Sequence, residues 1–214
     1  MRNLTCGLTP YLVCLALGAA ACGGDDAVDS DEQARRAYLA LDKSIQKSID
    51  LGFQGYTDAS SANIAPHTAN GDAAGTITVG GQVDQGASNN KGMRLNVGMV
   101  GYDDGPVEYN TDHDKVHVVF DTSTTATDQP YLSMQLKSIP TGTLEGTLTA
   151  NSSMLGVYTL SGDITGTLTL SLTITGMLMA GTAPIITVRV PGSTTVTGTA
   201  TNSDGGVYNI SITI

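Results

Sequence analysis

The sequence contains no tryptophan and only two phenylalanines, and aromatic residues make up 5% of its 214 positions. Basic residues are also few, since 10 Lys and Arg stand against 20 Asp and Glu and the formal net charge is −10. A chain of this charge repels nucleic-acid phosphates and anionic lipid headgroups. We therefore expect no nucleic-acid partner and no electrostatic docking on lipid.

Cysteine is scarce as well, and its three positions, Cys6, Cys14 and Cys22, all lie near the start of the chain. The remainder can form no disulfide, so its stability must come from a packed core. Residues 22–214 are long enough to form one domain with such a core.

Motifs of the common enzyme classes are missing. The sequence has no Walker loop, dinucleotide-binding glycine pattern, G-x-S-x-G or H-E-x-x-H. Ser44 and Lys47 match S-x-x-K, but the companion motifs K-T-G and S-D-N are absent, so the match is attributed to chance. His67 stands alone in an expected loop, where it is predicted to be solvent-exposed. We predict that the protein is not an enzyme and uses no cofactor.

The first residues are typical of an export signal. Arg2 is the only charged residue before Asp25, and an apolar run covers residues 11–21. This run has about half the length needed to span a bilayer, which favours a secretory signal peptide over a transmembrane helix. Residues 1–21 are therefore predicted to be removed.

The end of this run, Leu-Gly-Ala-Ala-Ala-Cys, resembles the lipobox of bacterial lipoproteins, with Ala19 where the family prefers leucine. The resemblance implies cleavage before Cys22 and acylation of its sulfur (diacylglyceryl, with palmitate as a typical chain), which anchors the protein in a membrane of the cell envelope. In that family an Asp after the cysteine retains the protein in the inner membrane, so Gly23 favours the outer membrane. The alternative is an ordinary signal peptide cut after Ala21, which leaves Cys22 as a free thiol.

After a short tether at residues 22–29, the sequence predicts one amphipathic helix over residues 30–52. Ser30 is a suitable N-cap and Gln33 completes a capping box, while Gly52 is a natural stop. Apolar residues recur at helical spacing and form one stripe: Ala34, Tyr38, Leu41, Ile45 and Ile49. We expect this stripe to pack on a sheet. The alternative, a helix on a membrane surface, is disfavoured because its polar face mixes both charge signs.

Residues 53–75 show little pattern and are predicted to be irregular, whereas residues 75–214 alternate as strands. The predicted fold is mainly β: an antiparallel meander of about nine to eleven strands, as a curved sheet, open barrel or sandwich, with the one N-terminal helix against it. The clearest alternation spans residues 158–179, where even positions are apolar or glycine. It is too long for one strand, and we predict a three-residue turn that pairs Leu160 with Ile164.

The richest polar stretch is Asp103–His117. Its Asn110, Asp112 and Asp114 alternate like the first oxygen ligands of a calcium loop, which makes them weak calcium candidates. The glycine expected next is Lys115, so a solvated acidic hairpin is the simpler interpretation. Strand periodicity places the histidines of this stretch on the face opposite to its carboxylates.

From residue 165 to 175 the odd positions of the alternating stretch are all threonine or serine: Thr165, Thr167, Thr169, Ser171, Thr173 and Thr175. They indicate either a flat recognition surface or simply β-propensity on a solvent face. Because uncharged exposed strands invite edge pairing, we expect this face to be partly covered.

The leading functional hypothesis is a cell-envelope lipoprotein with a non-enzymatic structural or interaction role. Its partners would be the membrane, through the lipid anchor, and an unidentified protein or lipid. The alternative is a carrier of an apolar ligand (a lipid or lipoprotein), which requires a cavity between helix and sheet lined by the even-numbered residues.

Overall fold

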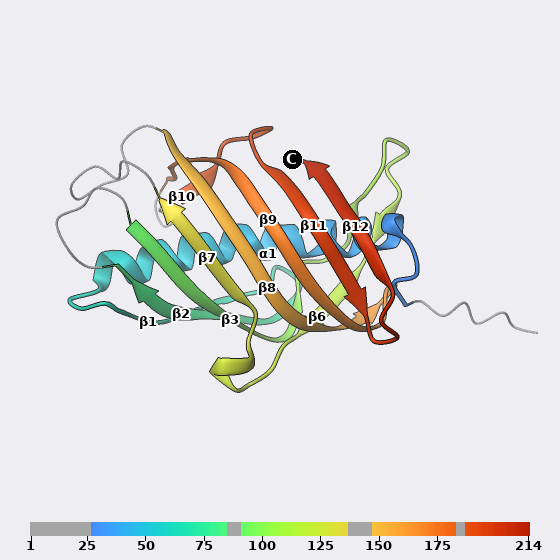
Figure 1. The fold of residues 1–214 in the computed structure, drawn as a ribbon, viewed down its shortest axis with the longest axis horizontal. Helices are drawn as coiled ribbons and strands as arrows, with labels where there is room; N and C mark the ends of the chain where they lie inside the picture. The colour runs from blue at the N-terminus through green and yellow to red at the C-terminus, as the bar shows by residue number, and fades with distance from the viewer. Residues whose placement is uncertain (1–26, 85–90, 137–146, 183–186) are drawn as a thin grey trace, which may run out of the picture.

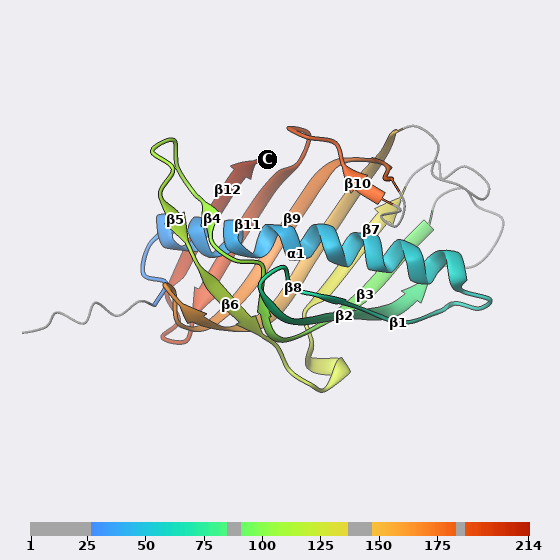
Figure 2. The ribbon, with the colours of Figure 1, turned by 180° about the vertical axis from the view of Figure 1, so that it is seen from behind.

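The computed structural model describes residues 27–84, 91–136, 147–182 and 187–214 (Figure 1). The fold is mainly β, as predicted: a curved antiparallel sheet of ten strands has one long helix, α1 (Asp31–Asp58), across its inner face. Figure 2 shows α1 crossing the strands obliquely on that side, and Figure 1 shows the opposite side, where the described strands of the sheet lie in front of the helix. The architecture is therefore two layers around one core.

The strands follow one another along the sheet with few crossovers. The order is β1-β2-β3-β6-β8-β9-β11-β12, with β7 pairing with both β3 and β8 and β10 pairing with β9, while β4 and β5 form a separate hairpin. The bounds are β1 (Asn63–Asn70), β2 (Ala74–Val83), β3 (Lys91–Asp103), β4 (Val107–Glu108), β5 (Lys115–Val116), β6 (Val118–Asp121), β7 (Tyr131–Leu136), β8 (Thr147–Gly162), β9 (Gly166–Ala180), β10 (Thr187–Arg189), β11 (Thr195–Asn202) and β12 (Val207–Thr213), with a 3₁₀ turn η1 (Ala126–Asp128).

The start of α1 confirms the predicted cap. The Ser30 side chain accepts a hydrogen bond from the Gln33 backbone N–H at 3.3 Å. The Gln33 side chain in turn accepts from the backbone N–H of Asp29 at 2.8 Å, one residue earlier than in a standard capping box. Together these bonds satisfy two backbone donors at the helix start.

The end of α1 differs from the prediction, because the helix passes Gly52 and ends at Asp58. Gly52 is buried against β3, where an added Cβ atom would lie 2.5 Å from Cδ1 of Leu95. The glycine therefore permits close packing between helix and sheet and does not end the helix. Residues 59–75, expected to be irregular, contain β1 and the start of β2. Strand β1 shows no clear alternation, since only Ile64 among its side chains is buried.

The core lies between α1 and the inner face of the sheet. All five residues of the helix stripe are 2% exposed or less. The even-numbered residues of β8 and β9 that face them, among them Tyr158, Leu168, Leu170, Leu172 and Ile174, are 4% exposed or less. A side chain lining a cavity wide enough for water would be more accessible than this, so the interior is packed at these positions.

The turn between β8 and β9 is longer than predicted. Leu160 pairs with Gly166, not with Ile164, so five residues separate the paired positions, and residues 163–165 connect the two strands. The reason is that β8 continues beside β6, where Gly162 pairs with Val118, so the chain cannot reverse at Ser161. The even-numbered side chains still share one face, and Ile164 is buried at the end of the core.

The packed interior can be tested with two neighbouring residues of β9. Leu172 points inward and is 3% exposed, whereas Thr173 points outward and is exposed. We expect Leu172→Ala to lower the free energy of unfolding by about 2–5 kcal/mol because it leaves a cavity. Thr173→Ala should change it by no more than about 0.5 kcal/mol. Urea denaturation measures both values, and equally small losses would mean that the inner face borders open space.

Candidate functional site

The structure contains three polar clusters, and the most buried of them joins α1 to Arg189 of β10. Its guanidinium group donates two hydrogen bonds to the carboxylate of Asp42 on α1, at 2.8 and 2.5 Å. Both side chains are 14% exposed. The hydroxyl of Tyr38 donates to the same carboxylate at 2.8 Å. Two parallel bonds of this kind fix the position of both groups, so this cluster aligns helix and strand.

Ionisation in this cluster follows from burial and charge. Burial raises the pKa of Tyr38, and the neighbouring Asp42 carboxylate raises it further, so the phenol stays protonated and donates. Burial by itself would lower the pKa of Arg189, but its bonds to Asp42 outweigh burial and the pKa is raised. The guanidinium group of Arg189 is therefore paired with Asp42 inside the protein.

Side chains of α1 also satisfy the free edge of β10. The Gln46 amide donates to the backbone oxygen of Thr187 at 2.8 Å, and its oxygen accepts from the backbone N–H of Arg189 at 2.9 Å. The Asp50 carboxylate accepts from the backbone N–H of Thr187 at 2.9 Å. The helix thus takes the place of a further strand beside β10 and protects this edge from pairing with another chain.

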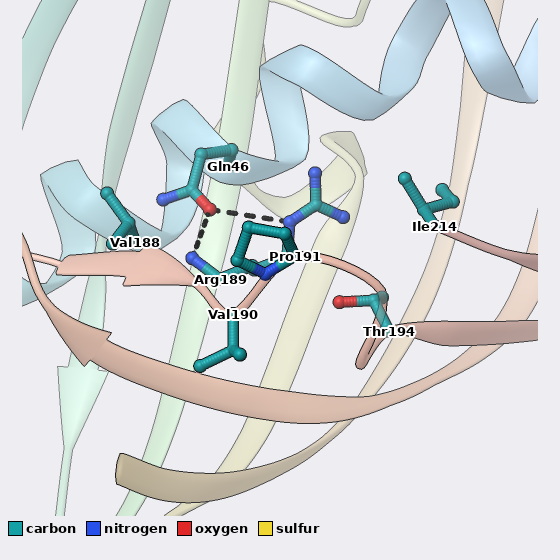
Figure 3. A pocket seen from close by; sticks show the side chains of 7 residues that line it. All are labelled: Gln46, Val188, Arg189, Val190, Pro191, Thr194 and Ile214. Carbon is teal, nitrogen blue, oxygen red and sulfur yellow. Dashed lines mark hydrogen bonds between the residues drawn. The ribbon is translucent and has the colours of Figure 1, made fainter. Parts of the chain in front are cut away.

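A pocket of about 270 Å³ lies beside this cluster, between α1 and the ends of β10, β11 and β12 (Figure 3). Its lining consists of Gln46, Val188, Arg189, Val190, Pro191, Thr194 and Ile214. Apolar atoms dominate, and the donors of Arg189 are already taken by Asp42 and Gln46. The volume lies just below the usual range for small-molecule sites, so the pocket suits a small apolar group.

The second cluster contains the lysine of the S-x-x-K match. Lys47 lies 2.5 Å from a carboxylate oxygen of Asp104 and 2.7 Å from one of Asp72, and Tyr102 donates to Asp104. Burial lowers the pKa of Lys47, but its hydrogen bonds to Asp104 and Asp72 raise it more. Ser44 is buried and donates to the backbone oxygen of Leu41 at 2.6 Å. Each partner of the match thus has its own structural contacts.

The third cluster is the β4–β5 hairpin, which contains the calcium candidates. The Asn110 side-chain oxygen accepts from the backbone N–H groups of Asp112 and Asp114, at 3.1 and 3.0 Å, and its amide donates to Asp114 at 3.0 Å. These bonds build the turn and occupy the oxygen that would be the first calcium ligand. In the part of the chain that the structure describes, no three His, Cys, Asp or Glu residues are grouped as a metal site. The calcium site stays a prediction.

The histidines are placed differently from the prediction. His113 lies 2.9 Å from the carboxylate of Glu108, and His117 lies 2.9 Å from that of Asp103. Strand periodicity separated these groups, but the residues around His113 form a turn, with a φ of 63° at His113 itself, so that periodicity does not apply. His67, expected in an exposed loop, is half-buried in β1 and lies 3.7 Å from Asp58.

The side of the sheet away from α1 is broad and has few charges, with Arg94 on β3 and Asp121 on β6. We call the outward-facing described side chains of β7, β8, β9, β11 and β12 the outer face. None of them is charged, and most carry a hydroxyl group. The threonines form ladders across strands, since Thr173 of β9 is paired with Thr197 of β11, and Ser171 with Thr199. We expected this face to be partly covered, and its described threonines and serine are mixed: Thr167, Ser171 and Thr173 are exposed, whereas Thr169 and Thr175 are half-buried.

The outer face also holds exposed apolar side chains, which the sequence reasoning missed. The large hydrophobic residues that are exposed in the described ranges are Val100, Tyr131, Leu155, Val157, Met177, Met179 and Val207. Val100 is on the outward side of β3, and the others belong to the outer face. Each of them occupies a position that alternates with the buried residues of its strand, and this alternation in the sequence could have identified them.

Cys22 itself lies outside the described residues, but Ala27 and Val28, five and six positions later, already contact the fold. Ala27 forms a bridge with Thr165, and Val28 is 1% exposed. The Asn202 side chain donates to the backbone oxygen of Val28 at 2.9 Å. The end of the predicted tether is therefore part of the fold.

Comparisons with known proteins add no assignment. No protein-family model matches the chain, and neither curated protein sequences nor solved structures give a significant match. Within the described ranges, no helix is long and apolar enough to cross a membrane.

The Asp42–Arg189 pair gives a prediction about stability. Asp42→Ala leaves a buried guanidinium group without its counter-ion, so we expect a loss of about 3–5 kcal/mol in the free energy of unfolding. Glu32 is a suitable control because its pairs with Arg35 and Arg36 are on the surface, and its side chain is 46% exposed. Glu32→Ala should cost at most about 1 kcal/mol. Similar losses in chemical denaturation would contradict the structural importance of the buried pair.

Proposed function

We propose that the protein is an acylated lipoprotein of the cell envelope, with a non-enzymatic structural or interaction role and the outer membrane as its favoured location. The observation that carries this proposal is the short distance along the chain between Cys22 and the fold. Ala27 already pairs with Thr165, so an acyl chain on Cys22 would hold the whole domain at the membrane surface.

The polar clusters support a role without catalysis. Arg189 is used by Asp42, and Lys47 by Asp104 and Asp72. Ser44 is buried and bonded to its own helix. These groups join α1 to the sheet, which is a structural use of the same residue types that an active site would need. The outer face, with its exposed hydroxyl and aliphatic groups, is the surface that remains for interaction.

The anchor is tested by the mass of the mature protein. Wild-type protein from the membrane fraction should exceed the mass of residues 22–214 by that of its acyl groups. Cys22→Ser should lack this added mass, because the sulfur that carries the diacylglyceryl group is gone. Cys14→Ser is the matched control, since its site lies in the removed segment and the mature mass should not change. A wild-type protein with an unmodified Cys22 would contradict the proposal.

A second candidate function, an apolar-ligand carrier, is favoured by one observation. The pocket beside Val190 and Ile214 lies between α1 and the sheet, where a carrier would hold its ligand. Its volume of about 270 Å³ admits a small apolar group or the end of a chain. The even-numbered side chains of β9 do not extend it, because they are packed.

Native mass spectrometry separates the two candidates. A carrier made as residues 22–214 with Cys22→Ser should retain a co-purifying apolar molecule. Val190→Phe fills the pocket and should release that molecule, while Val207→Phe, on the outer face, should not. A ligand-free mass for the parent protein after gentle purification would count against the carrier.

A further inference from the structure

The point where the chain enters the fold lies at one end of the outer face. Ala27 bridges to Thr165 in the β8–β9 turn, and Val28 is bonded to Asn202, where β11 turns into β12. Figure 1 shows these turns at the end of the sheet near which α1 begins. The attachment point is therefore next to the outer face, at the beginning of its long strands.

The length of the tether limits how far this end can be from a membrane. Five residue steps separate Cys22 from Ala27, and an extended chain covers at most about 3.3–3.6 Å per residue, or roughly 17 Å in all. This step rests on the proposed acylation of Cys22. With the anchor in place, the β8–β9 and β11–β12 turns stay within that distance of the lipid headgroups.

The distribution of charge decides which side faces the lipid. On the α1 side, the β4–β5 hairpin presents the exposed carboxylates of Glu108, Asp112 and Asp114. Anionic headgroups repel these groups at distances up to about 8–10 Å at moderate ionic strength. The outer face carries no charged side chain, and the charged residues beside it on the same side of the sheet are engaged within the protein, Arg94 of β3 with Asp84 and Asp121 of β6 with the backbone N–H of Gly101. The approach of this face to the headgroups therefore costs less than that of the hairpin.

The outer face also offers apolar contact near the attachment point. Val207 and Val157 belong to one row across four strands, in which Val207 pairs with Thr201, Thr201 with Thr169, and Thr169 with Val157. Val207 is 60% exposed and Val157 44%, and Leu155 beside them is 60% exposed. The transfer of aliphatic side chains from water to a lipid interface is favourable, and hydroxyl groups keep hydrogen-bonding partners there.

We propose that the outer face lies against the headgroup layer of the membrane that holds the acyl anchor, with α1 and the β4–β5 hairpin turned away. Asp163 and Asp204 lie in the two turns at the rim of this face, which restricts the contact to the headgroup region. Threonine and serine hydroxyls then bond to phosphate and ester oxygens, and the side chains of Leu155, Val157 and Val207 lie among the headgroups.

Site-specific quenching on the acylated full chain tests this orientation. Single cysteines replace Thr173 on the outer face or Asp112 at the hairpin tip, and each carries an environment-sensitive fluorophore. The protein is placed in vesicles of phosphatidylethanolamine and phosphatidylglycerol, with a nitroxide on part of the headgroups. We expect several-fold stronger quenching for Thr173→Cys than for Asp112→Cys. Both side chains are exposed, so the substitutions should leave the fold intact, which thermal unfolding checks.

Other outcomes overturn the proposal in distinguishable ways. Equal quenching, or stronger quenching at the hairpin, on a protein whose mass confirms acylation rejects the orientation and leaves the lipoprotein assignment standing. A Thr173 label that is shielded in native membranes but unquenched in vesicles indicates a protein partner on the outer face instead. An unmodified Cys22 removes the premise and rejects both proposals.

Discussion

The packing of one apolar helix stripe against one face of a curved sheet is the constraint on which the rest of the structure depends. Tyr38, Leu41 and Ile45 on α1 are almost inaccessible, and so are the inward-facing residues of the sheet beneath them. A sheet with a helix on a single side has one buried face, so its other face must be stable in contact with water or a partner. The alternation of apolar and hydroxyl residues along β9 follows directly from this arrangement.

The hydrophobic stripe does not by itself fix the position of α1 along the sheet, because apolar contact is not directional. The polar clusters fix the position of α1 along the sheet. Asp42 bonds to Arg189 on β10, and Lys47 bonds to Asp104 after β3, so the same helix is held at two separate strands. Gln46, between these two residues on the helix, completes the edge of β10. Charged residues are few in this protein, and several of them are used for alignment.

The sequence predicted the features that depend on residues close together in the chain. It did not predict the features that depend on contacts between distant residues. The N-cap at Ser30 and the alternation of residues 158–179 depend on neighbours in the chain, and both are found in the structure. The role of Gly52 depends on Leu95, which belongs to a distant strand. Asp42 and Arg189 are 147 positions apart, and the pocket likewise combines Gln46 of α1 with residues near the end of the chain. No local sequence pattern predicts such contacts.

The outer face connects the fold to the proposed role. Long strands without charge are a hazard in solution, because exposed uncharged strands invite association with other chains. Natural sheets usually place lysine or proline on an edge strand to prevent it, yet β12, the edge strand beside β11, carries neither. A protein held at a membrane by a short tether meets a different environment, since a lipid surface covers a neutral face. If the proposed anchoring holds, the lack of charge on this face suits its position against the lipid, and the acidic hairpin on the opposite side is directed towards water.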